Sequence, residues 1–121
     1  MRAVICHEFG SIKDLVVEDI ALPPTAVDEV RIGVRASGVS FATGLIVAGK
    51  YQRKPPRPFA PGAEVAGEVL EVGANVTSFQ PGDRVFASVD WGGWAQEALA
   101  KDFLTHRIPD GLDFAQATLL P

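Results

Sequence analysis

Residues 61–73 have the sequence PGAEVAGEVLEVG, in which glycines at positions 62, 67 and 73 bracket and interrupt an apolar run. Valines and a leucine nearly alternate with glutamates in the second half of the run, which predicts a β-strand. Gly67 lies inside this strand, where glycine weakens β structure. We therefore expect Gly67 to mark a close backbone contact or a β-bulge.

Other segments have the composition of short strands separated by turns. Residues 29–39 alternate most clearly, with Val30 and Ile32 on one face and Arg31 and Arg35 on the other. The remaining expected strands are residues 1–6, 15–20, 84–89, 94–100 and 104–108. Many short strands at roughly ten-residue spacing, with Pro and Gly turns, predict a mainly β fold. A sandwich or a partly open barrel with a few short helices would fit this pattern.

Two short helices are expected between the strands. Ser40 is a good N-cap and Gly49 a natural stop, which predicts a helix over residues 41–48. Asp113 starts a capping-box pattern, which predicts a second helix close to the end of the sequence. Residues 50–61 contain four prolines and four cations, so this segment must be an extended loop.

The composition restricts the classes of function. The 121 residues are 47% hydrophobic and 21% charged, as expected for one globular domain. A net charge of −4 argues against nucleic acid or an anionic membrane surface as a partner. The single cysteine, Cys6, excludes an internal disulfide and fits a reducing compartment. No apolar run reaches the roughly 18 residues that span a bilayer, so we expect a cytoplasmic protein.

Short motifs along the whole chain occur in the order found in medium-chain dehydrogenases and reductases. They are MRAV at 1–4, the strand and cap at 30–40, GKY at 49–51, PGAE at 61–64, GDRV at 82–85, GGWA at 92–95 and ATLLP at 117–121. Together they resemble the N-terminal, GroES-like catalytic domain of that superfamily, and within it the zinc-independent quinone oxidoreductases related to zeta-crystallin. The resemblance implies a GroES-like, partly open β-barrel over residues 1–121. It also implies a Rossmann domain for NADPH, whose glycine-rich fingerprint these residues lack.

The resemblance also bears on metal binding. In the zinc branch of the superfamily, the positions of Ser40 and Ala63 carry a cysteine and a histidine that ligate the catalytic zinc. Glu64 alone cannot complete the usual three-ligand site, and the cysteines of the family's structural zinc lobe are missing. We therefore expect no zinc, and we expect Glu64 to fix a loop by hydrogen bonds.

The resemblance places the cofactor-binding residues at the start of the first helix. It implies that Ser40, Phe41, Ala42 and Thr43 line the nicotinamide pocket. Helix capping, worth about 1 kcal/mol, is the competing role for Ser40 and is preferred. Core packing is the alternative for Phe41 and Ala42, and it is the preferred role for Trp91.

Tyr51 is the only tyrosine and the candidate catalytic residue. Many members of the resembled family carry two tyrosines in this region, and the first is replaced here by Leu45. A phenol is protonated at neutral pH, so Tyr51 would donate a hydrogen bond or a proton to a carbonyl oxygen rather than act as a base. The alternative is a loop tyrosine packed on the proline run.

The function predicted is the catalytic-domain half of an NADPH-dependent, zinc-independent quinone oxidoreductase. The resemblance implies hydride transfer from NADPH to a quinone or conjugated enone in a cleft between two domains, and a homodimeric whole enzyme. Without a metal, hydrogen bonds must polarise the carbonyl, which suits conjugated acceptors. The isolated chain is expected to be inactive. Two alternatives are an enoyl-thioester reductase of the same superfamily and a non-catalytic GroES-like interaction module.

Overall fold

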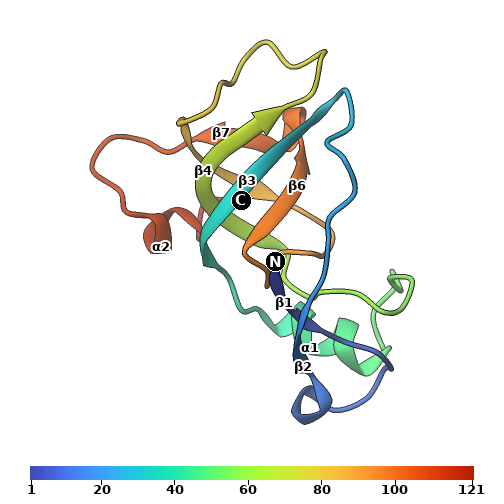
Figure 1. Cartoon of the computed structure of the whole chain (residues 1–121). Helices are drawn as coiled ribbons and strands as arrows, with labels where there is room; N and C mark the ends of the chain where they lie inside the picture. The colour runs from blue at the N-terminus through green and yellow to red at the C-terminus, as the bar shows by residue number, and fades with distance from the viewer.

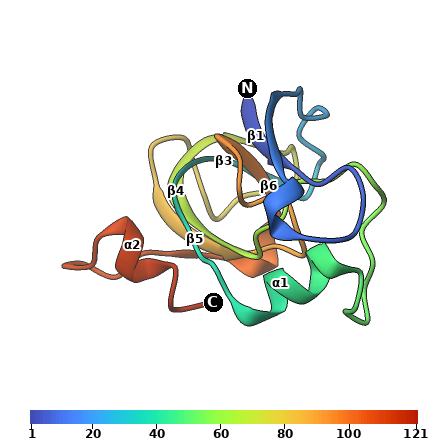
Figure 2. The same ribbon diagram turned by 90° about the horizontal axis from the view of Figure 1, so that it is seen from below.

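A curled, five-stranded antiparallel sheet dominates the computed structural model, which describes residues 1–121 (Figure 1). Its strand order is β6-β3-β4-β5-β7. The strands are β3 (Glu29–Ser37), β4 (Glu64–Val72), β5 (Arg84–Ser88), β6 (Glu97–Lys101) and β7 (Thr105–Arg107). A separate two-stranded sheet pairs β1 (Arg2–Ile5) with β2 (Val16–Asp19). The predicted partly open β-barrel is confirmed, and Figure 2 shows the strands curving around its interior.

The main core fills the inside of this curl. Val30 and Ile32, on the predicted apolar face of β3, are fully buried. They pack with the buried residues Val65, Val69, Val76, Val85, Ala87, Ala98 and Ala100. Burial of a valine or isoleucine side chain contributes about 1.5–3 kcal/mol, so the alternation along β3 and β4 drives the closure of the sheet.

Gly67 meets the backbone of the neighbouring strand, as the sequence predicts. A Cβ atom at this position would stand 2.0 Å from the carbonyl oxygen of Gly33 on β3. The β3–β4 register also shifts between Arg31 and Ile32 and again between Val34 and Ala36. The glycine therefore lets the two central strands approach each other where their ladder is irregular.

The two predicted helices are present and capped. Helix α1 (Phe41–Ala48) begins after Ser40, whose Oγ accepts a hydrogen bond from the Thr43 backbone N at 3.4 Å, and ends at Gly49 with a φ of 73°. Helix α2 (Phe114–Ala117) has both hydrogen bonds of the predicted capping box. Two 3₁₀ turns, η1 (Ile12–Asp14) and η2 (Asp102–Leu104), were not anticipated. Neither α-helix has the length and hydropathy of a membrane span.

Strand β6 begins at Glu97, three residues later than the expected start of 94. The backbone N of Trp94 donates instead to the Pro61 carbonyl, and the Trp94 carbonyl accepts from the backbone N of Val4. These residues therefore join the smaller sheet to the segment before β4, and only the later part of the predicted strand enters the barrel. In Figure 1, β1, β2 and α1 lie together below the five-stranded sheet.

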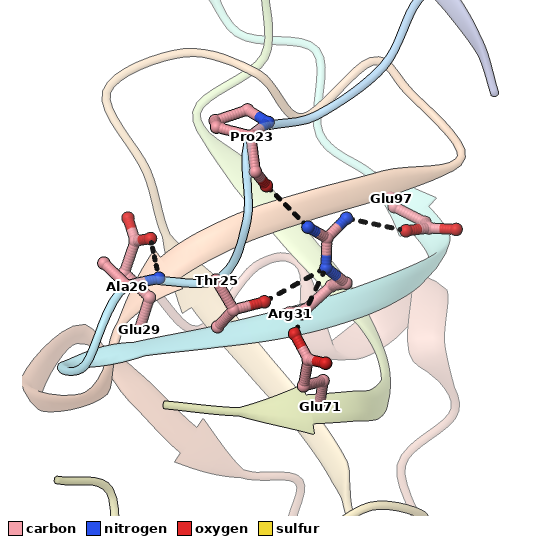
Figure 3. A network of polar contacts seen from close by, with 7 residues as sticks. All are labelled: Pro23, Thr25, Ala26, Glu29, Arg31, Glu71 and Glu97. Carbon is pink, nitrogen blue, oxygen red and sulfur yellow. Dashed lines mark hydrogen bonds and ion pairs between the residues drawn. The ribbon is translucent and has the colours of Figure 1, made fainter. Parts of the chain in front are cut away.

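Arg31, on the polar face of β3, ties the preceding segment to the sheet (Figure 3). Its guanidinium donates to the Pro23 carbonyl at 2.6 Å, to Thr25 Oγ1 at 3.1 Å and to Glu97 Oε1 at 3.0 Å. Glu71 Oε1 lies 3.9 Å from its Nε. Only 17% of the Arg31 side chain is exposed, so these partners replace most of its water contacts.

Candidate functional site

A pocket of about 230 Å³ lies beside the N-terminal half of α1. Its lining residues come from three segments that are far apart in the sequence: α1 with the loop after it, the start of β4, and the loop after β5. They are Ser40, Ala42, Thr43, Ile46, Tyr51, Arg53, Ala63, Glu64, Val89, Asp90 and Trp91. The fold thus brings hydroxyl, phenol, carboxylate and indole groups around one space.

Four of the five predicted site residues line this pocket, namely Ser40, Ala42, Thr43 and Tyr51. The hydroxyls of Ser40 and Thr43 lie 3.1 Å apart and also form the N-terminal cap of α1. Capping and a place in the pocket are therefore compatible. Tyr51 is 37% exposed, which leaves part of its ring open to solvent and to a ligand.

Phe41 lies outside this pocket. Its side chain is 85% exposed, so the alternative of core packing is wrong for this residue. Phe41 lines a neighbouring apolar depression of about 460 Å³ together with Val39, which is 80% exposed, and Leu45. Ser40 and Thr43 border both spaces, so the apolar surface and the hydroxyl-lined pocket adjoin at the start of α1.

Glu64 supports the site in a different way from the one predicted. Its backbone carbonyl, not its carboxylate, accepts hydrogen bonds from the Gly38 backbone N at 2.9 Å and from Ser37 Oγ at 3.1 Å. Its Oε2 atom is buried without a hydrogen-bond partner. A Cβ atom at Gly38 would stand 2.7 Å from that oxygen, so Gly38 leaves the room that the carboxylate occupies. The backbone therefore fixes the loop that leads into α1.

Two charged residues of the pocket wall were not anticipated as part of a site. Arg53 donates from Nη1 to Asp90 Oδ1 at 2.5 Å and from Nη2 to Asp90 Oδ2 at 2.8 Å. The partners are 37 residues apart, and no local pattern connects them. Trp91, expected in the core, is half-buried and also lines the pocket. It packs against a second, smaller core cluster formed by Cys6, Ile46, Val47 and Phe59.

The pocket brings together the three positions that the resemblance relates to zinc binding: Ser40, Ala63 and Glu64. Of these, only Glu64 has a side chain that commonly ligates zinc. No group of three or more His, Cys, Asp and Glu side chains in the chain is placed to hold a metal ion. The residues present therefore do not fit a catalytic zinc site.

Comparison with known proteins places this geometry in a family. The model of the alcohol dehydrogenase GroES-like domain matches residues 26–110. A quinone oxidoreductase-like protein 2 homolog of Nematostella vectensis is 45% identical over 121 residues, which cover 98% of this chain and 33% of that protein. Human quinone oxidoreductase is 43% identical over 122 residues, which cover 99% of this chain and 37% of that protein. The chain thus spans about a third of the length of the curated relatives it matches.

Solved structures agree with the sequence comparison. The Escherichia coli quinone oxidoreductase, solved in complex with NADPH, superposes with a TM-score of 0.91 at 25% identity, over 98% of this chain and 36% of that one. The quinone oxidoreductase of Coxiella burnetii superposes with a TM-score of 0.92 at 26% identity, over 100% of this chain and 41% of that one. Both likenesses extend over nearly all of the fold described above.

Proposed function

This chain belongs to the alcohol dehydrogenase GroES-like domain family, in its quinone oxidoreductase-like branch, and we propose that it supplies the acceptor-binding part of an NADPH-dependent quinone or enone reductase. The observation that carries the proposal is the pocket beside α1, which Ser40, Thr43 and Tyr51 all line. Its size and its mixture of apolar walls and a few hydroxyl groups suit a small conjugated carbonyl compound.

The start of α1 fits the nicotinamide end of NADPH. A nicotinamide ring has flat, largely apolar faces, and Val39 and Phe41 expose apolar surface directly beside the hydroxyls of Ser40 and Thr43. The cofactor, when bound, supplies the hydride. Ser40, Phe41, Ala42 and Thr43 would hold that end only, because the chain has no glycine-rich turn between a strand and a helix for the pyrophosphate.

The chain's own residues would bind and polarise the acceptor. Tyr51 would donate a hydrogen bond to the acceptor's carbonyl oxygen, where negative charge develops during reduction. Ile46 and Trp91 would hold the apolar ring and exclude water. Ser40 and Ala63 supply neither thiolate nor imidazole, so this proposal assigns carbonyl polarisation to hydrogen bonds.

A chimera tests the proposal. In it, the part of human quinone oxidoreductase that this chain matches is replaced by residues 1–121, and NADPH oxidation is followed with a benzoquinone and with a conjugated enone. We expect turnover with at least one acceptor. Tyr51→Phe should lower kcat by about 10- to 100-fold while leaving NADPH binding intact, because only the phenol hydroxyl is removed.

Other outcomes of that experiment separate the alternatives. Turnover of a crotonyl thioester but of no quinone or enone would favour an enoyl-thioester reductase. A folded chimera that binds NADPH and reduces no acceptor would contradict the proposal and favour an interaction module. The 121-residue chain alone should not oxidise NADPH. Turnover by it would refute the proposal that the chain holds only the nicotinamide end of NADPH and needs the rest of the enzyme.

The proposal includes a cytoplasmic location and a homodimeric whole enzyme. The free and buried thiol of Cys6 is compatible with a reducing compartment. The net charge of −4 gives no general attraction to nucleic acid or anionic lipid. Cell fractionation and the measured mass of the complete protein in solution would test these two points.

A further inference from the structure

The Arg53–Asp90 ion pair joins two loops that both contribute to the wall of the pocket beside α1. Arg53 lies in the loop between α1 and β4, and Asp90 lies just after β5. Both nitrogens of the guanidinium fork reach the carboxylate, at 2.5 and 2.8 Å. Both residues also line the pocket. Such paired hydrogen bonds fix the relative orientation of two groups better than a single contact does.

The two ends of the Arg53 loop are anchored independently of this pair. At the start, the backbone N of Lys50 donates to the Leu45 carbonyl at 2.9 Å, at the end of α1. Further along, Phe59 exchanges two backbone hydrogen bonds with Cys6, at 2.8 and 3.1 Å. Between these anchors, residues 51–54 are all exposed. Within this stretch, Arg53 alone makes side-chain hydrogen bonds to the rest of the fold.

We propose that the Arg53–Asp90 pair is a latch that holds residues 51–54 against the β5–β6 loop and thereby positions Tyr51 at the pocket. Tyr51 lies two residues before Arg53 and lines the same pocket. The inference about Tyr51 rests on the function proposed above, whereas the latch itself does not. Arg53 and Asp90 are then positioning residues that act through Tyr51.

The exposure of the pair makes the latch reversible. The Arg53 and Asp90 side chains are 63% and 53% exposed, so water and salt compete for both. Ion pairs of this exposure shift an equilibrium by about two- to fivefold, and dissolved salt weakens them. The closed position of the stretch should therefore be favoured only a few-fold, and less at high salt than at low salt.

Limited trypsin digestion of the 121-residue chain tests the latch without any assay of activity. Trypsin can cut after Lys50 and Arg53, whereas the bonds after Lys54 and Arg57 precede proline and resist it. Asp90→Asn keeps the shape of the side chain but removes its charge. Because this change also frees Arg53 for the protease, cleavage after Lys50 is the informative rate. We expect that rate to rise about two- to fivefold at low salt.

A matched variant and a salt series complete the digestion experiment. Glu68→Gln breaks a comparable exposed ion pair, Arg35–Glu68 at 3.4 Å, whose residues do not line this pocket, and should leave the rate after Lys50 unchanged. High salt should accelerate cleavage of the wild-type chain but hardly that of Asp90→Asn. The double variant Arg53→Asp, Asp90→Arg should restore protection. Equal rates after Lys50 in wild type and Asp90→Asn at low salt would overturn the latch.

The chimera described above tests the link to Tyr51. There, Asp90→Asn should lower kcat by about two- to fivefold with little change in the KM for NADPH, and the charge-swapped double variant should recover the loss. An unchanged kcat in an active chimera would overturn the positioning role. If the chimera reduces no acceptor, the proposed function fails, while the rate of cleavage after Lys50 still decides the latch.

Discussion

Replacing Gly67 by alanine should destabilise the fold more than any other single added methyl group on the central strands. The new Cβ would stand 2.0 Å from the Gly33 carbonyl oxygen and 2.9 Å from its carbon, whereas real Cβ atoms essentially never come within 3.0 Å of such atoms. Relief requires the strands to move apart by about 1 Å at this point. A separation of that size takes neighbouring ladder hydrogen bonds beyond their normal length.

The expected loss of stability combines two costs, overpacking and lost hydrogen bonds. Overpacking in a rigid interior costs about 1–3 kcal/mol, and each backbone hydrogen bond lost costs about 1 kcal/mol more. With two bonds lost, we expect Gly67→Ala to lower the free energy of unfolding by about 3–5 kcal/mol. That is a large share of the roughly 5–15 kcal/mol that stabilises a typical domain.

Urea denaturation followed by far-ultraviolet circular dichroism measures this loss. Gly33→Ala is the matched control, because its Cβ would meet only the flexible end of the Leu70 side chain, at 3.2 Å. The control should cost less than about 1 kcal/mol. The reasoning would be refuted by a Gly67→Ala protein within about 1 kcal/mol of wild type, or by a control that costs as much.

Two further predictions concern Arg31 and Cys6. Arg31→Met should lower the free energy of unfolding by about 2–3 kcal/mol, because three hydrogen-bond acceptors lose their donor. Arg35 belongs to an exposed ion pair, so Arg35→Met should cost less than about 0.5 kcal/mol. Urea denaturation of the two variants tests this difference. Burial raises the pKa of the Cys6 thiol, despite the opposing charge of Arg57. The contribution of the protonated thiol to stability is therefore complete below the unfolded pKa of about 8.5 and is lost as pH rises through the folded pKa. The free energy of unfolding of the wild type should consequently fall more than that of Cys6→Ala between neutral and alkaline pH.

Features set by local chemistry could be predicted from the sequence. Ser40 and Gly49 bound α1 because capping needs only neighbouring residues and a left-handed final residue. The buried face of β3 follows from alternation alone, since successive side chains point to opposite sides of a strand. Gly67 could be recognised because glycine weakens the interior of a strand and often marks a point where another backbone comes close.

Features that depend on distant partners could not be predicted. The contact of Arg53 with Asp90 needs the loop between α1 and β4 and the loop between β5 and β6 to be in place. Core packing, the alternative role considered for Phe41, is excluded because α1 presents that side chain away from the barrel, which hydrophobicity alone does not reveal. Similarly, Glu64 looked like a hydrogen-bonding side chain, but its backbone carbonyl makes the contacts.

The pocket wall and the main core share only Val89, which packs against the edge of the core. The residues that pack inside the barrel, such as Val30, Ile32 and Val85, do not line the pocket beside α1, and the pocket's most exposed members lie on loops. Substitutions at Tyr51, Arg53 or Asp90 therefore leave the barrel's packing untouched. Evolution and protein engineering can consequently diversify the range of accepted ligands on this scaffold at little risk of losing its ability to fold.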